Sequence, residues 1–128
     1  KGRRIKTYSA FGFATLHAIA GLKRRRRGSH RHAIEVTHRD AWIDRAIQTV
    51  DRNYDLGVEV LNCRRLIKGY SDTHARGLTK YDRVMAAIAK LESREDAADW
   101  ARRLREAAIR DASGAMLDGA IKTIESFA

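Results

Sequence analysis

Apolar residues recur at three- and four-residue spacing along most of the chain, which is typical of helices that bury one face. Ser9 is expected to cap a first helix that runs to about Arg26. Gly28 and Ser29 then separate it from a second helix at about residues 30–52. Because the first helix is apolar on most faces, we expect it to be buried.

The same periodicity predicts four further helices. Asn53, Tyr54 and Asp55 supply a turn and a cap before a third helix, which is expected to end at Gly69. The clearest stripe follows a polar loop and consists of Tyr81, Val84, Met85, Ile88 and Leu91. Ser93 and Asp96 resemble a capping box in front of a fifth helix, and a break at residues 113–114 precedes the last one. No alternating strand pattern is found. The sequence predicts an all-α class: one domain over residues 1–128, folded as a single bundle of about six helices.

The segment LIKGYSDTHARG, residues 66–77, interrupts this pattern and is expected to be a loop between two glycines. It holds the candidate binding or interface residues Lys68, Tyr70, Asp72, His74 and Arg76. Three interpretations stay open. The segment is a helix-to-helix corner, it holds an anion or a partner's carboxylate, or Asp72, His74 and a hydroxyl form an acid–base set.

Charge narrows the choice of partners. The net charge is +10 and the pI is near 10.4, a balance that attracts phosphates, anionic lipid or an acidic protein. Most of the excess lies in the first third, including the run at residues 23–27. Nucleic acid is not favoured, because neither stacking aromatics nor a reading helix is evident. The apolar run at residues 10–22 is too short to cross a bilayer, so we expect no membrane contact. The single cysteine fits a reducing cytoplasm, which is the expected location.

The single cysteine, Cys63, allows neither an internal disulfide nor a cysteine-ligated cluster within this chain. Its place on an apolar stripe predicts a buried structural thiol. His30, His32 and His38 are close in sequence but lack the carboxylates or cysteines of a zinc site. Trp42 and Trp100 are expected to pack in the core. We therefore expect no catalytic residue, no metal and no cofactor in this chain.

The segment RLIKGYSDTHARGLTKYDRVM, residues 65–85, resembles a signature in the C-terminal helical region of indolepyruvate (aryl-pyruvate) ferredoxin oxidoreductases, found in the beta subunit or in a fused chain. GRRIKTYSAFGFATLHAIAGLKRRRRGSHRH and AWIDRAI are similar to the basic start and the tryptophan-bearing helix of that region. The resemblance covers about residues 2–89 and is weaker beyond them.

This resemblance implies a parent enzyme that oxidatively decarboxylates an aryl 2-oxoacid to its acyl-CoA, using thiamine diphosphate and iron–sulfur clusters. The chain itself has no thiamine diphosphate motif and no cysteine set. It is therefore expected to be a fragment of a longer chain, an accessory helical module whose partners are the catalytic domains. A dimer of the isolated module is possible through its exposed apolar surface. The alternative is a free-standing basic helical protein that binds nucleic acid or an acidic partner.

Overall fold

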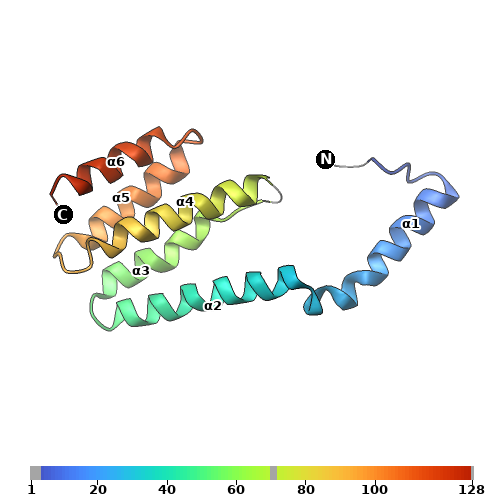
Figure 1. Cartoon of the computed structure of the whole chain (residues 1–128), viewed down its shortest axis with the longest axis horizontal. Coiled ribbons are helices and arrows are strands. Elements are labelled where there is room, and N and C mark those ends of the chain that lie inside the picture. The colour runs from blue at the N-terminus through green and yellow to red at the C-terminus, as the bar shows by residue number, and fades with distance from the viewer. Residues whose placement is uncertain (1–3, 70–71, 128) are drawn as a thin grey trace. The chain divides into compact units, whose positions relative to one another are not determined.

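The computed structural model of the chain describes residues 4–69 and 72–127, without the side chains of Arg24, Arg26, Arg27 and Arg31. Within these residues it contains six α-helices, two short 3-10 helices and no strand (Figure 1), which confirms the predicted all-α class. The chain divides into two compact units, Lys1–Arg39 (unit 1) and Asp40–Ala128 (unit 2). The expectation of one domain over the whole chain stays a prediction.

Unit 1 consists of α1 (Ala10–Gly21), the 3-10 helix η1 (Leu22–Gly28) and the beginning of α2 (His30–Val50). The Ser9 hydroxyl accepts a hydrogen bond from Gly12 N at 3.0 Å, so the predicted N-cap is confirmed. The helix ends at Gly21, several residues before the predicted end, where the backbone tightens into η1. The prediction of a buried helix was wrong. Gly12 is the one buried residue of α1, because unit 1 supplies no apolar element to cover this helix.

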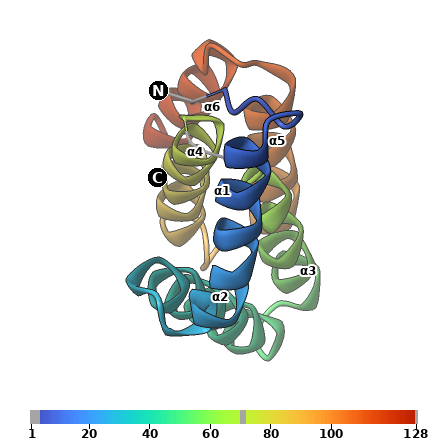
Figure 2. The same ribbon diagram turned by 90° about the vertical axis from the view of Figure 1, so that its right-hand side faces the viewer.

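Unit 2 contains the rest of α2 together with α3 (Tyr54–Asn62), the 3-10 helix η2 (Cys63–Leu66), α4 (Asp72–Ala89), α5 (Ala97–Arg110) and α6 (Ala115–Glu125). Helix α5 is the centre of the bundle and packs against α3, α4 and α6 (Figures 1 and 2). The predicted apolar stripes of α3 to α6 meet in one core, whose largest fully buried side chains are Leu56, Val60, Cys63, Val84, Ile88, Leu91, Leu104, Leu117 and Ile124.

The connection from α3 to α4 differs from the predicted loop. The third helix ends at Asn62 and continues as η2 only to Leu66, while α4 already begins at Asp72. Gly69 has a φ of +76°, a left-handed conformation that glycine adopts without steric cost, and this conformation lets the chain turn after η2. Gly77 does not break a helix. It is buried inside α4, where a Cβ would lie 2.6 Å from the Leu66 carbonyl oxygen, so glycine permits close approach of the two segments.

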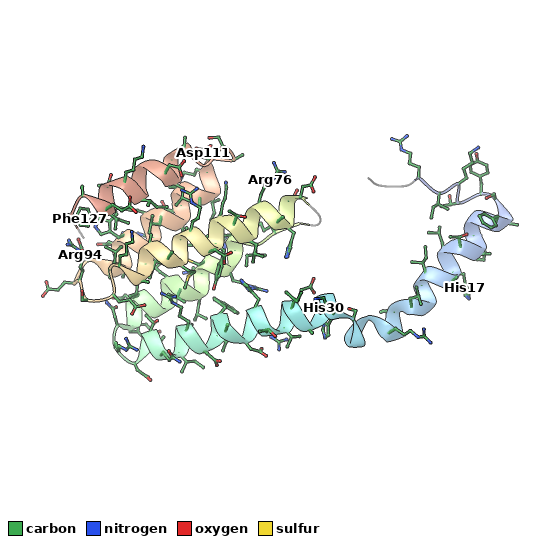
Figure 3. The ribbon with its side chains drawn as sticks, in the orientation of Figure 1. His17, His30, Arg76, Arg94, Asp111 and Phe127 are labelled. Atoms are coloured by element: carbon green, nitrogen blue, oxygen red, sulfur yellow. The ribbon has the colours of Figure 1, made fainter. Side chains whose placement is uncertain are left out.

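The predicted capping box in front of α5 is absent. Asp96 occupies the N-cap position but makes no side-chain cap hydrogen bond. Its carboxylate instead accepts from Arg94 at 2.7 and 2.9 Å and from the Trp100 indole at 3.1 Å. The Arg94 guanidinium also lies 4.6 Å from the centre of the Phe127 ring (Figure 3). The acid therefore joins the α5 start to the C-terminal segment.

Both tryptophans pack against the core, as predicted, and each is partly buried. The Trp42 indole donates to the Val60 carbonyl at 3.0 Å, and the Arg64 guanidinium lies 5.6 Å from the Trp42 ring. The Val60 carbonyl lies in the last turn of α3, where the carbonyl groups of an α-helix lack α-helical donors, and the indole satisfies it. Within the described ranges, the helices are all too short or too polar to cross a membrane.

Candidate functional site

The candidate residues lie on a turn and a helix rather than in one loop. Lys68 follows η2 and is exposed, whereas Asp72, His74 and Arg76 belong to the first turns of α4. Tyr70 lies outside the described residues. The helix constrains the acid–base interpretation, since positions two residues apart, such as Asp72 and His74, do not face each other on a helix.

An open depression of about 250 Å³ lies where η2, the start of α4 and the end of α5 meet. Two of the candidates, Lys68 and Arg76, line it. The others, Asp72 and His74, are not among its lining residues. The full lining is Arg65, Leu66, Lys68, Thr73, Arg76, Gly77, Lys80, Ala108, Ile109 and Ala112.

The α4 side of this depression follows helical spacing. Thr73, Arg76, Gly77 and Lys80 are separated by three, one and three residues, so they share one face of the helix. Because Gly77 lets η2 approach this face closely, the cations of both segments reach the same hollow. Figure 3 shows Arg76 near the same end of the bundle as Asp111, which follows α5.

Lys80 stabilises the contact between two of the helices that line the depression. Its ammonium donates to the Ala108 carbonyl at 3.0 Å and to the Asp111 carbonyl at 2.5 Å. These carbonyls belong to the C-terminal end of α5, where a cation also offsets the negative end of the helix dipole. Lys80 thereby links α4 to the end of α5 at one side of the depression.

Arg76 is oriented by the backbone of its own helix. Its Nε donates to the Asp72 carbonyl at 3.3 Å. The guanidinium is exposed at the helix start, where it offers a planar set of donors that suits carboxylate or phosphate.

The electrostatics of the depression are one-sided. Its described lining includes four cationic side chains, Arg65, Lys68, Arg76 and Lys80, and no Asp or Glu. Like charges that share a hollow attract a counter-ion, and both arginines offer bidentate geometry. The arrangement therefore suits binding of a carboxylate or phosphate group. The sequence did not identify Arg65 and Lys80 as site residues. The four-residue spacing of Arg76 and Lys80 nevertheless indicated that Lys80 shares a helix face with Arg76.

A larger depression of about 410 Å³ lies between α2, the start of α3 and the end of α4 in unit 2. Its charges are largely paired with one another. Glu92 accepts from Arg45 at 3.1 Å and lies 3.7 Å from Arg52. Such internal pairing leaves a weaker field for a charged ligand than the one at η2 and α4.

Cys63 has the properties of a structural thiol. It is fully buried between α3 and the core, and burial is the main cause that raises its pKa to about 12. A thiol of this kind is a poor nucleophile and a poor metal ligand, because both roles require the thiolate. In the described part of the chain, no three His, Cys, Asp or Glu side chains group as metal ligands do.

Comparison with known proteins yields one family. The model of DUF6537, described as a family of unknown function, matches residues 1–87. This range includes Arg65, Lys68, Arg76 and Lys80, but not the α5 residues of the depression. No curated protein and no solved structure matches the chain.

Proposed function

The chain belongs to the DUF6537 family, a family of unknown function, and from the resemblance of residues 65–85 to the oxidoreductase signature we propose that it is a helical, non-catalytic module of a 2-oxoacid ferredoxin oxidoreductase. The parent enzyme oxidatively decarboxylates indolepyruvate or another aryl-pyruvate to its acyl-CoA in the cytoplasm. The module packs on the catalytic domains of that enzyme, and its Lys68–Gly77 corner lies at an interface or at the edge of the active site.

One observation carries this proposal. The segment that resembles the oxidoreductase signature, residues 65–85, also supplies Arg65, Lys68, Arg76 and Lys80 to a single depression whose described lining includes no Asp or Glu. A carboxylate of the oxoacid, a phosphate of CoA or a carboxylate on a neighbouring domain would each satisfy these cations. The cationic corner is therefore one part of the module that contacts the rest of the enzyme.

The cofactors of the parent do not fit this chain. An iron–sulfur cluster needs several thiolates, whereas Cys63 is the only cysteine and is a buried thiol with a pKa of about 12. The described residues also offer no glycine-rich strand–turn–helix for thiamine diphosphate. The redox and decarboxylation steps belong to other domains, and this module contributes binding and positioning.

The test is Arg76→Ala in the whole enzyme, with assembly measured by size-exclusion chromatography and turnover by acyl-CoA formation. We expect weaker assembly or a raised KM for the oxoacid or CoA. Arg83→Ala is the matched control, because Arg83 lies on the same helix but pairs with Asp118 on α6, outside the depression. If Arg76→Ala leaves both assembly and turnover at the level of the control, the corner has no such role.

The alternative is a free-standing basic protein that binds nucleic acid, and one observation favours it. Tyr8 and Phe11, each 84% exposed, lie in the cationic unit 1, where they could stack on bases. Filter binding to duplex and single-stranded DNA at low and high salt separates the two functions. Tight and steeply salt-dependent binding supports the alternative, and weak binding supports the enzyme module.

A further inference from the structure

The two units differ completely in charge. Unit 1 holds eleven lysines and arginines and one acidic residue, Glu35, so its net charge is +10. Unit 2 holds fifteen basic and fifteen acidic residues and is neutral. The whole excess charge of the chain therefore belongs to the unit whose described residues include no buried apolar side chain.

Helix α1 is the second unusual feature of unit 1. It carries no Lys, Arg, Asp or Glu over its 12 residues, and its apolar side chains are exposed. Phe11 is 84% exposed, Phe13 67% and Ile19 52%, and Figure 3 shows side chains projecting from both sides of the helix. A helix without a polar face is expected to be covered on most of its circumference, since exposed apolar surface costs about 25 cal/mol per Å².

Charge and shape together define the kind of surface that covers α1. A groove, rather than a flat face, is needed to surround a helix that is apolar on all sides. The cations that flank the helix, among them Lys6, Lys23 and Arg25, require carboxylates at the rim of that groove. Neutral unit 2 offers no net negative charge, and a second copy of the chain would bring two units of +10 together.

A lipid surface fits less well. Helices that lie in a membrane interface have a polar face and an apolar face, and α1 has no charged side on its circumference. Its 12 residues also span only about 18 Å, short of the about 30 Å of a bilayer core. A protein groove is the environment that satisfies both the apolar helix and its cationic flanks.

We propose that unit 1 is a docking arm: α1 inserts into an apolar groove with an acidic rim on the catalytic domains of the parent enzyme. This inference rests on the proposed function for the identity of the partner. The docking arm contributes binding free energy to assembly with the catalytic domains. The Lys68–Gly77 corner of unit 2 makes a separate contact.

The experiment measures binding of the 128-residue chain to the 2-oxoacid oxidoreductase domains encoded beside or in frame with it, produced without residues 1–128. Titration calorimetry is done at about 50 and about 300 mM NaCl. We expect Phe11→Gln/Ile19→Gln to weaken binding at least about tenfold at both salt concentrations. Lys23→Glu/Arg25→Glu should weaken it at least about tenfold at low salt and reduce its salt dependence.

The matched controls make the same kinds of substitution in unit 2, outside the docking arm. Ile47→Gln/Met116→Gln replaces two side chains that are 58% and 52% exposed, and Arg102→Glu/Lys122→Glu makes the same change in charge. Both controls should bind within about twofold of the wild type. The melting temperature of the isolated chain should not change in Phe11→Gln/Ile19→Gln, because both side chains are exposed within unit 1.

Four results would overturn the docking arm. Arm variants that bind as the controls do, while Arg76→Ala weakens binding, would leave the proposed function intact and remove the arm. Absence of binding by the wild-type chain would remove both. A melting temperature lowered by several degrees in Phe11→Gln/Ile19→Gln would mean that α1 packs within its own chain. Tighter binding to vesicles containing about 30% phosphatidylserine, or to duplex DNA, would assign the arm to lipid or nucleic acid.

Discussion

Gly77 on α4 lies against the main chain of Leu66, so close that a Cβ at this position would come within 2.6 Å of the Leu66 carbonyl oxygen. This contact brings η2 onto the first turns of α4 and gives the cationic depression its two walls. The next atoms are also main chain, since the same Cβ would be 3.3 Å from the Ile67 α-carbon. The backbone of η2 would have to move to accept any side chain.

Gly77→Ala is therefore expected to lower the free energy of unfolding by about 1–3 kcal/mol, although alanine is the better helix former. Urea denaturation measures the change. Gly119→Ala on α6 is the control, because a Cβ there meets nothing within 4 Å, and it should raise stability by about 0.5–1 kcal/mol. A Gly77→Ala protein that gains stability as the control does would contradict the close contact.

Glu59 on α3 and Arg105 on α5 form an ion pair that is largely shielded from solvent. Their atoms lie 2.9 Å apart, and the side chains are 15% and 12% exposed. Glu59→Ala leaves Arg105 without its partner and should cost about 2–3 kcal/mol. Glu59→Leu/Arg105→Leu removes both charges and should come within about 1 kcal/mol of the wild type.

The exposed pair Lys90–Glu125, with side chains that are 49% and 50% exposed, is the comparison for this prediction. Glu125→Ala should cost at most about 1 kcal/mol, because solvent screens both charges. Equal losses in Glu59→Ala and Glu125→Ala would mean that the inner pair is no stronger than a surface pair.

Asp111 ties the end of α5 to the start of α6. Hydrogen bonds from the Ser113 hydroxyl at 2.6 Å, Met116 N at 2.9 Å and Ser113 N at 2.7 Å hold the pKa of its carboxyl well below the ordinary value. A lowered folded-state pKa contributes stability above the unfolded pKa of about 4, and that contribution is lost as the pH falls through the folded value. Asp111→Ala should therefore lower the melting temperature by a few degrees at pH 7.

The difference in melting temperature between the wild type and Asp111→Ala should shrink steadily as the pH is lowered from about 4. The reason is that the Asp111 carboxylate becomes protonated in both the folded and the unfolded wild type. Scanning calorimetry across this range measures it. Glu95→Ala is the control, because Glu95 is an exposed residue between α4 and α5. Its melting temperature should match that of the wild type at neutral pH. A difference that grows toward low pH would have the wrong sign for a lowered pKa.

Cys63 should resist thiol reagents as long as the chain is folded. Its pKa of about 12 lowers the thiolate fraction by about a thousandfold relative to an ordinary cysteine, and the side chain is fully buried. Labelling with a disulfide reagent at about pH 8 should then follow unfolding and accelerate with urea. Cys63→Ser/Ser93→Cys, with its thiol in the exposed α4–α5 connection, should react at once. Equally fast labelling of the native thiol would contradict its burial.

Much of the helical architecture is encoded locally and could be predicted. The cap at Ser9, a cap within residues 53–55 and the apolar stripes of the core helices depend on residues three or four positions apart, and the structure has caps at Ser9 and Asn53. The burial of Cys63 followed from the same periodicity. A residue's nearest neighbours along a helix are visible in a sequence, so these inferences needed no tertiary contact.

By itself, then, the sequence determined an all-α chain with its charge excess near the N-terminus and a buried cysteine. Tertiary structure decided that Gly77 belongs to a helix, because its role depends on the Leu66 carbonyl, a contact that no local pattern reveals. It also decided which cations share a depression, since Lys80 reaches the carbonyls at the end of α5, about thirty residues away. Periodicity records which residues share a helix face, whereas only packing records which faces meet.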